Sequence, residues 1–255
     1  KLSNTGAFLW AKQIAGTQDH FANAIATDDL GNIYLGGKFR QTIHFAPPSG
    51  LPLATGYNND QAFICQYSPN GTVNWREAFS GSGIHINALT VDNGYLYTAG
   101  LFYVDAQFGT GTSLVVASGT ESAFVAKHTT SGVAEWASEI TGTGATNASG
   151  VRVDNLGNVY TGGYFNGQVD FAPGVDTEYL TSQGATSDGF ISKLDANGNN
   201  LSATAVGGNG NDEIIALNAT PAGDIYGGGR FDGVMTVAAG AGGPTLTSNG
   251  FGDIL

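Results

Sequence analysis

A seven-residue pattern recurs four times along the chain and constrains its fold more than any other feature. It first reads IYLGGKF at Ile33–Phe39, and it returns as LYTAGLF (96–102), VYTGGYF (159–165) and IYGGGRF (225–231). Its tyrosines are spaced by 63, 63 and 66 residues. A fixed period of this kind is typical of a chain built from one repeated supersecondary unit.

Each unit shows the same succession of four predicted strands, which we call A, B, C and D. An apolar stretch with a turn of Asp, Asn and Gly, as in NAIATDDLGN (23–32), predicts strand A. The tyrosine pattern is strand B, and segments such as QAFICQYSPNG (61–71) and TVNWREAF (72–79) predict strands C and D. Turn-forming residues indicate tight connections from A to B and from C to D.

About twenty residues separate strand B from strand C, and they predict either an extra short hairpin or a folded loop. No helical periodicity of useful length is present. Four-stranded units repeated about a centre describe a β-propeller. The predicted fold is therefore all-β, a propeller of four repeats of about 63 residues each. A solenoid of stacked β coils is the alternative, but solenoid coils are shorter and lack this pairing of two hairpins.

We expect one domain over residues 1–255, with repeat units at 20–79, 80–140, 141–206, and 207–255 together with 1–19. The first residues resemble the second half of strand C followed by strand D, and the last residues resemble the first half of strand C. Either the two ends meet in one blade and close a four-bladed ring, or the chain is a module of a longer tandem array. Because a strand is divided in its middle, we expect the gene product to extend beyond this chain.

Composition excludes several classes of partner. The net charge is −12 and Lys plus Arg number nine, whereas binding to nucleic acid or to anionic lipid needs a basic surface. No apolar run reaches the length that spans a bilayer, so membrane insertion is not expected. Cys65 is the single cysteine, which rules out an intrachain disulfide and a cysteine-based zinc site.

Three linked stretches carry a resemblance to a known family: FANAIATDDLGNIYLGGKF (21–39), QVDFAPGVDTEYLTSQGATSDGFISKLDANGN (168–199) and AFLWAKQIAGTQ (7–18). In them the chain resembles the bacterial β-propeller repeat proteins called SBBP repeats. The resemblance implies an exported or surface protein, often from Bacteroidota-like bacteria and often part of a long multidomain chain. It implies no reaction. The fourth unit departs most, with Val237 where the other units have phenylalanine, and Leu201 stands where tryptophan is expected.

Acidic residues recur at two places in the unit. Asp28, Asp92 and Asp154 end strand A beside turn residues, and we interpret them as turn-makers whose side chains bond the local backbone. Calcium binding at these turns is the alternative, because carboxylates and carbonyls suit a hard cation. A second set opens strand C and is interpreted as accepting hydrogen bonds from the backbone of the B–C segment, the alternative being a ring that binds a cation or a cationic partner. This set is Asp60, Glu121, Asp188 and Asp253.

Histidines and aromatic residues offer further candidates. His20 and His85 both lie just before a predicted strand A, where Asp19 and Asp212 would complete a metal site, although ordinary loop roles are the simpler interpretation. The recurring tryptophans of strand D are expected to pack between sheets, with an exposed sugar-binding surface as the alternative. They are Trp10, Trp75 and Trp136.

One position varies while its neighbours recur, namely the residue before the last phenylalanine of strand B. In a repeat scaffold the frame repeats and the binding surface diverges, so we predict that these residues bind a partner. They are Lys38, Leu101, Tyr164 and Arg230. The two adjacent small residues of strand B, such as Gly36 and Gly37, are interpreted as a steric consequence of neighbouring blades that converge on the axis.

The function predicted from these features is that of a non-catalytic, extracellular, structural or adhesive module with a protein partner or with itself as partner. A carbohydrate-binding module is the alternative, and a propeller-type lyase or glycosidase is a third class. No cofactor is expected apart from calcium at the turns of strand A. The location expected is extracellular or at the cell surface.

Overall fold

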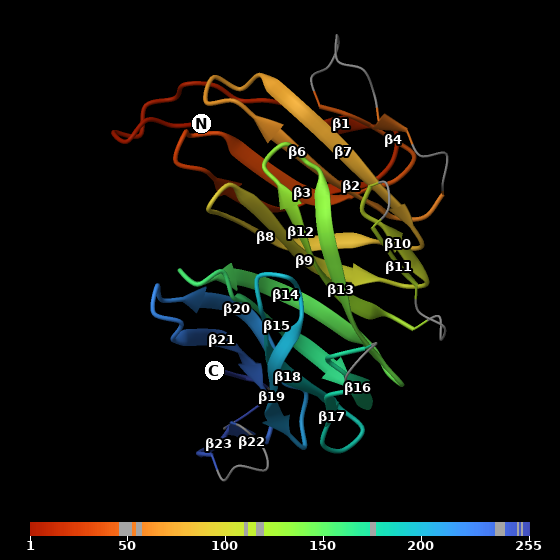
Figure 1. The fold of residues 1–255 in the computed structure, drawn as a ribbon. Helices are drawn as coiled ribbons and strands as arrows, with labels where there is room; N and C mark the ends of the chain where they lie inside the picture. The colour runs from red at the N-terminus through yellow and green to blue at the C-terminus, as the bar shows by residue number, and fades with distance from the viewer. Residues whose placement is uncertain are drawn as a thin grey trace.

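The computed structural model describes residues 1–45, 53–54, 58–109, 112–115, 120–173, 177–237, 243–248, 250 and 252–255. These residues form 24 strands and no helix, which confirms the prediction of an all-β chain. The sheets follow one another in a curved stack from the N-terminus to the C-terminus (Figure 1). No helix in the described part of the chain has the length and apolar character needed to cross a membrane.

The first complete sheet, sheet I, has six antiparallel strands in the order β11-β10-β7-β6-β3-β2. Four of them are strands A to D of one unit: β2 (His20–Thr27), β3 (Ile33–Phe39), β6 (Gln61–Tyr67) and β7 (Val73–Gly81). The other two form a hairpin from the B–C segment of the next unit, and they are β10 (Asp105–Gln107) and β11 (Ser113–Val115). The B–C segment therefore contains a hairpin, and that hairpin extends the sheet of the preceding unit.

Sheets II and III repeat this arrangement, with strands A to D of one unit followed by the hairpin of the next. Sheet II contains β8 (His85–Asp92), β9 (Tyr95–Phe102), β12 (Ser122–Thr129), β13 (Ala134–Gly142), β16 (Gln168–Asp170) and β17 (Tyr179–Thr181). Sheet III contains β14 (Thr146–Val153), β15 (Val159–Asn166), β18 (Ser187–Leu194), β19 (Asn200–Gly208), β22 (Val234–Val237) and β23 (Thr245–Thr247).

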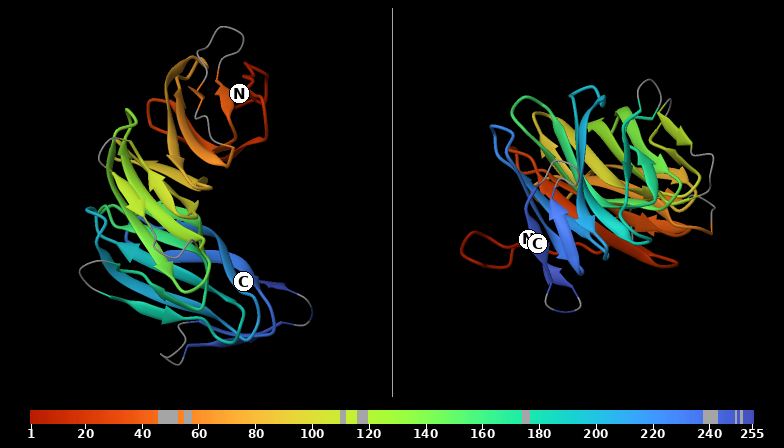
Figure 2. Two further views of the ribbon diagram at one scale, coloured as in Figure 1. Left: turned by 90° about the vertical axis from the view of Figure 1, so that its right-hand side faces the viewer. Right: turned by 90° about the horizontal axis from the view of Figure 1, so that it is seen from below.

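A three-stranded sheet stands at each end of the stack. The N-terminal end sheet holds a strand D and a hairpin: β1 (Ala15–Gly16), β4 (Thr42–His44) and β5 (Leu53–Ala54). The C-terminal end sheet holds strands A, B and the start of C: β20 (Glu213–Ala219), β21 (Ile225–Phe231) and β24 (Asp253–Ile254). The two end sheets do not pair with each other, and they lie at opposite ends of the curve (Figure 2, left). The described structure is thus propeller-like but open, and closure into four blades stays a prediction.

The apolar core lies between successive sheets. Four separate clusters of buried apolar residues fill the four gaps, one between each sheet and the next along the stack. Central strands are largely buried: every residue of β6 is buried, as is every residue of β12 except the last. A strand covered on both faces needs apolar or small residues at successive positions, which explains why strands B and C do not alternate between apolar and polar residues.

Strand A carries a one-residue bulge at the same place in all four units. Pairing between strands A and B shifts register there, for example between Ala22 and Ala24, so that Asn23 is the extra residue. The bulge brings a carbonyl of strand A against the second small residue of strand B. A Cβ atom on Gly37 would lie 1.9 Å from the carbonyl oxygen of Phe21. This glycine is therefore required by a neighbour in its own sheet, and its attribution to converging blades was wrong.

The first small residue of the strand B pair does face the next sheet. A Cβ atom on Gly36 would lie 2.8 Å from Cγ2 of Ile86 and 2.9 Å from Cδ2 of Leu89, both on β8 of sheet II. Gly162 meets Ile214 and Leu217 in the same way. For this residue the predicted cause, close packing between blades, agrees with the structure.

Candidate functional site

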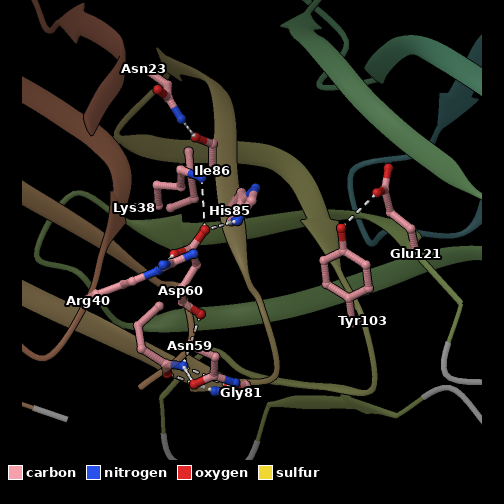
Figure 3. Close-up of polar contacts among 11 residues, drawn as sticks. Asn23, Lys38, Arg40, Asn59, Asp60, Gly81, His85, Ile86, Tyr103 and Glu121 are labelled. Carbon is pink, nitrogen blue, oxygen red and sulfur yellow. Dashed lines mark hydrogen bonds and ion pairs between the residues drawn. The ribbon is translucent and has the colours of Figure 1, made fainter. Parts of the chain in front are cut away.

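A polar cluster joins sheets I and II where strand B ends and strand C begins (Figure 3). Asp60 precedes β6 and accepts hydrogen bonds from Lys38 Nζ (2.8 Å), from Arg40 Nε and from His85 Nε2 (2.8 Å). Lys38 and Arg40 come from the end of strand B in sheet I, whereas His85 begins strand A of sheet II. One nearly buried carboxylate thus ties two sheets together.

Electrostatics in this cluster favour an ionised Asp60. Burial alone would raise the pKa of this carboxyl group, but the hydrogen bonds from Lys38, Arg40 and His85 outweigh burial and hold the pKa at about 2. Burial and the nearby Lys38 ammonium lower the pKa of His85. At neutral pH the imidazole is therefore uncharged and donates its Nε2 proton to Asp60.

Further polar contacts follow this cluster along the stack, and we call the cluster and these contacts together the polar row. The next member is Glu121. Its carboxylate accepts hydrogen bonds from Tyr103 (3.1 Å) and from Tyr164 (3.0 Å), which belong to sheets II and III. Further along, Arg230 lies 3.5 Å from Glu213 in the C-terminal end sheet. A shallow hollow of about 370 Å³ opens beside the first part of this row. Its lining residues are Arg40, Asn59, Asp60, Ser82, Gly83, His85 and Tyr103.

The predicted partner-binding residues have different surroundings. Lys38 is held by Asp60, and Tyr164 is held by Glu121. The Arg230 side chain is 63% exposed, which leaves most of its guanidinium surface open to a partner. Leu101 is only 5% exposed, so its prediction as a surface contact was wrong.

We expect Asp60→Asn to lower the free energy of unfolding by about 2 kcal/mol at pH 7, because Lys38 and Arg40 lose their counter-charge. The folded-state pKa of Asp60 lies below its ordinary value of 3.8. The contribution is therefore complete above pH 4 and disappears as the pH falls toward about 2. Urea unfolding of both proteins at pH 7 and at pH 2.5 measures this. Equal stability of the two proteins at pH 7 would contradict the expectation.

Asp28 and Asp154 are saturated by their own turns. The carboxylate of Asp28 accepts hydrogen bonds from the Leu30 and Asn32 backbone amides, from Asn32 Nδ2 and from the Tyr34 hydroxyl, at 2.8–3.1 Å. Asp154 repeats all four contacts within its turn. For both, burial would raise the pKa, but these donors lower it. These four contacts per carboxylate match the turn-making interpretation.

Asp92 differs because its turn is shorter. Asn93 and Gly94 form the turn with positive φ angles of 46° and 80°, and Asn93 Nδ2 donates to Asp92 Oδ2 at 2.8 Å. Burial raises the pKa of Asp92. Within the described residues no group of three or more His, Cys, Asp and Glu side chains is placed to hold a metal ion. Calcium at these turns stays a prediction.

The set of acids predicted to open strand C does not share one position. Asp188 and Asp253 lie opposite the last phenylalanine of strand B, at Phe165 and Phe231. In sheets I and II that position is taken by Gln61 and Ser122, so Asp60 and Glu121 precede it by one residue. The alternative of a ring of four equivalent acids therefore does not hold. The favoured interpretation, acceptance of backbone hydrogen bonds from the B–C segment, agrees with the Gln183 amide on Asp188, whereas Asp60 and Glu121 accept hydrogen bonds from side chains.

Asp188 is the most confined of these acids. It is fully buried, and its Oδ1 atom has no hydrogen-bond partner in the described structure. Its Oδ2 atom accepts one hydrogen bond, from the Gln183 amide at 3.1 Å. Burial, together with the charge of Asp212, raises the pKa of Asp188 to about 6.

We expect Asp188→Asn to raise the free energy of unfolding by about 1–3 kcal/mol at pH 7. The folded-state pKa exceeds the ordinary 3.8, so ionisation penalises the folded state and wild-type stability falls as the pH rises from about 4 to 6. The neutral amide carries no such penalty. Urea unfolding at pH 7 should show the gain, and unfolding at pH 4 should show nearly equal proteins. A variant that is less stable at both pH values would refute this role of Asp188.

The four groups considered as a metal site do not meet. His20 Nδ1 contacts the Gln18 carbonyl oxygen at 2.8 Å, and His85 contacts Asp60. Asp212 accepts hydrogen bonds from the backbone amides of Gly208 and Asp232. Both histidines open a strand, His20 in β2 and His85 in β8, so the simpler interpretation as loop residues was wrong, and His85 joins sheet II to Asp60 of sheet I.

The tryptophans of strand D join each sheet to the next. Trp10 Nε1 donates to the Pro69 carbonyl (3.2 Å), Trp75 to that of Thr130 (2.9 Å) and Trp136 to that of Ala196 (3.1 Å). Each acceptor lies in the C–D turn of the following sheet. Packing between sheets is therefore confirmed for Trp75 and Trp136, which pack against the clusters between sheets I and II and between sheets II and III. The indole N–H group of all three tryptophans is already used.

The tryptophan position in sheet III was assigned to the wrong residue. Gln66 pairs with Trp75 and Lys127 with Trp136, whereas Lys193 pairs with Ser202. Ser202, and not Leu201, therefore takes the tryptophan position. Leu201 is the bulged residue of the C–D pairing, as Asn74 and Glu135 are in sheets I and II. A count of four residues from the glycine of each C–D turn gives Trp75, Trp136 and Ser202, so the sequence spacing could have found this position.

Comparison with known proteins supports the repeat type. Residues 9–38 match the family model described as SBBP: Beta-propeller repeat. They span β1, β2 and most of β3, so the match runs from strand D of one unit into strands A and B of the next. No curated protein matches the chain. A solved structure, the crystal structure of the WD40 beta propeller domain of Doa1, is similar at 10% sequence identity and a TM-score of 0.30. That similarity covers 94% of this chain and 86% of that chain.

Proposed function

We propose that the chain is a non-catalytic structural or adhesive module that works through protein–protein contacts outside the cell or at its surface. One observation carries the proposal. Ile25 of β2 is 66% exposed, although Leu89, Val151 and Leu217, which hold the same repeat position, are 5%, 0% and 4% exposed. The face of sheet I that carries Ile25 is therefore exposed, whereas the corresponding residues of sheet II, sheet III and the C-terminal end sheet are buried.

This exposed face includes an apolar groove of about 570 Å³. Its apolar wall comes from β2, β3 and β6 of sheet I and from the segment before β1, and Lys1 and Lys12 also line it. The apolar lining residues are Trp10, Ala11, Ile14, Ile25, Ile33, Leu35 and Tyr67. A contiguous apolar hollow beside polar residues is typical of a surface that binds protein.

The polar row offers less to a substrate. The oxygens of Asp60 and Glu121 are engaged by neighbouring side chains. An acid held at a pKa of about 2 by three donors is a poor general base at neutral pH. This supports the non-catalytic part of the proposal, and the resemblance to SBBP repeat proteins supports a bacterial origin and an extracellular location.

The carbohydrate-binding alternative receives no comparable support, because the indole N–H groups of the three tryptophans bond backbone carbonyls of the next sheet. A glycan array remains its direct test. The lyase or glycosidase alternative needs two acids free to act in one cleft.

A photo-crosslinking residue at position 25 tests the proposal. We expect p-benzoylphenylalanine in place of Ile25, in cells that produce the protein, to give a covalent adduct with a polypeptide identified by mass spectrometry. Leu156 is 80% exposed on the A–B turn of sheet III and serves as the matched control position without an adduct. Absence of any polypeptide adduct at position 25 would overturn the proposal. Cell fractionation of the same culture tests the location.

A further inference from the structure

We propose that the hollow between sheets I and II binds a neutral pyranose sugar. The hollow measures about 370 Å³ and lies beside the first part of the polar row, at the junction of two six-stranded sheets (Figure 3). It shares no lining residue with the apolar groove of sheet I, and no tryptophan lines it. The inference therefore adds a ligand to the proposed function and does not depend on it.

Arg40 holds unused hydrogen-bond donors at the edge of the hollow. Its Nε atom donates to Asp60, and this ion pair fixes the plane of the guanidinium group. The two terminal amino groups make no hydrogen bond within the described part of the chain, and the Arg40 side chain is 45% exposed. A ligand hydroxyl group can therefore accept a hydrogen bond from a donor that is already oriented.

Asp60 keeps one acceptor site beside these donors. A carboxylate has about four lone-pair sites. Lys38 and His85 donate to Oδ2, whereas Arg40 is the one described residue that donates to Oδ1. A free acceptor site on Oδ1 thus stands next to free donors on the guanidinium group. Hydroxyl groups both donate and accept, so two neighbouring hydroxyl groups of a sugar ring satisfy donor and acceptor together.

Ser82 adds a third polar group. Its hydroxyl makes no hydrogen bond with another described residue. Its backbone is held on both sides, because the Ser82 amide donates to the Asp105 carbonyl oxygen at 3.1 Å and the Tyr103 amide donates to the Ser82 carbonyl oxygen at 2.9 Å. The polar wall and the aromatic wall of the hollow are therefore fixed to each other before a ligand arrives, which reduces the entropy cost of binding.

Tyr103 supplies the aromatic wall. The residue is 40% exposed, and its hydroxyl donates to Glu121 Oε2 at 3.1 Å. The ring also lies against Gly83, where an added Cβ atom would be 2.5 Å from Tyr103 Cδ2. These contacts hold the ring and leave part of its surface open. C–H groups cover one face of a pyranose ring, and an exposed aromatic surface is a suitable partner for such apolar groups.

The charges around the hollow favour a neutral ligand. Asp60 offsets one of the two positive charges of Lys38 and Arg40. Two further carboxylates make the sum negative, namely Asp19 beside Arg40 and Glu121 at the hydroxyl group of the aromatic wall. The whole chain carries a net charge of −12. A surface of this sign repels an anionic ligand, whereas it does not oppose a neutral sugar.

The combination of donors and aromatic wall is specific to this junction. By repeat position, the junction of sheets II and III has Tyr103 where this junction has Arg40, and it has Asn166 where this junction has Tyr103. It therefore lacks both the guanidinium donors and the aromatic wall at these positions. A repeat scaffold that binds a ligand keeps its frame and changes its surface residues between units, which is what these two junctions show.

Saturation-transfer NMR on the 255-residue chain, with the methyl α-glycosides of glucose, galactose and mannose, tests the inference. We expect transfer to at least one of the three glycosides, strongest at the C–H groups of one ring face. Arg40→Gln and Tyr103→Ala should each weaken the affinity for that glycoside at least about tenfold. Ser82→Ala removes a hydroxyl that has no internal partner, so it should weaken binding about threefold and keep the wild-type melting temperature.

Two exposed residues outside the hollow give matched controls. Arg230→Gln removes a guanidinium group whose side chain is 63% exposed beside Glu213. Tyr179→Ala removes a tyrosine that is 56% exposed on β17. Both variants should bind the glycoside as the wild type does. If Arg40→Gln lowers the stability of the polar row, Ser82→Ala still tests the site, because it breaks no hydrogen bond among the described residues.

Three results would overturn the inference. The first is transfer to none of the three glycosides, and the second is an affinity that the substitutions at Arg40, Tyr103 and Ser82 leave unchanged. The third is binding of glucuronate or inorganic phosphate at least about tenfold more tightly than the best neutral glycoside, which would identify an anion site. A chain that gives the polypeptide adduct at position 25 and binds no glycoside would overturn this inference while the proposed function stands.

Discussion

Gly163→Ala is expected to lower the free energy of unfolding by at least about 3 kcal/mol, the upper range for overpacking in a rigid core. The added Cβ would lie 1.8 Å from the Asn147 carbonyl oxygen, a backbone atom of strand A in the same sheet. A flexible side chain could move aside, but this carbonyl is fixed where strand A bulges between Ala148 and Gly150. Urea unfolding monitored by circular dichroism measures the loss.

Gly228→Ala is the matched control for this prediction. It lies in strand B of the C-terminal end sheet, and nothing comes closer to an added Cβ than 4.0 Å. We expect no loss, or a gain of about 0.5–1 kcal/mol from reduced freedom of the unfolded chain. If Gly163→Ala were as stable as wild type, the bulge would not be the reason for the recurring glycine.

His128 is expected to make the protein less stable in mild acid. Its imidazole is fully buried and stacks on Phe79 at a ring distance of 5.3 Å. Its Nε2 atom lies 3.2 Å from the Thr98 hydroxyl, whereas its Nδ1 atom has no hydrogen-bond partner among the described residues. Burial lowers the pKa of His128 to about 4, from an ordinary 6.5.

The sign of the pH effect follows from this shift. Below pH 6.5 the His128 imidazole binds a proton in the unfolded state, whereas in the folded state it stays neutral until the pH reaches about 4. Stability contributed by the neutral imidazole is therefore complete above pH 6.5 and is lost as the pH falls toward 4. The loss amounts to about 3 kcal/mol. Urea unfolding at pH 7.5 and pH 4.5 should show it.

Leu194 identifies the control substitution. It pairs with Val159 as His128 pairs with Leu96, so the repeat already places leucine at this position in sheet III. We expect His128→Leu to flatten the pH dependence between 6.5 and 4. Because Asp188 acts in the opposite direction over part of this range, the comparison is best made in the Asp188→Asn background. An unchanged pH dependence there would show that His128 is not the titrating group.

The repeat pattern predicted much of the fold because strands A to D are local. Their boundaries follow from turn residues that close hairpins within the unit. The pairing of each B–C hairpin with the preceding sheet was not predicted, since it joins residues of different units, such as Ala106 and Gly81. Nothing in the hairpin sequence states which strand edge it extends.

Candidate site residues were predicted unevenly for the same reason. Asp28 and Asp154 bond within their own turns, and sequence proximity revealed that role. Asp60 and His85 belong to different units and meet only because sheet II packs on sheet I. Two single-residue register differences could have been found from spacing. Ser202 stands four residues after the C–D turn glycine, as the tryptophans of sheets I and II do, and Asp188 stands two residues before Phe190, whereas Asp60 stands three before Phe63.

By itself, then, the sequence determined the four-fold repeat, the all-β class and the turn chemistry, because each depends on interactions among neighbours along the chain. Tertiary structure decided which faces are covered and which carboxylates are paired. It also decided that the second small residue of strand B must be glycine where strand A bulges, and that the described strands of the two end sheets do not pair with each other. The covered faces and the paired carboxylates depend on how sheets stack, through contacts between residues of different units. The glycine depends on the pairing of strands A and B within one sheet.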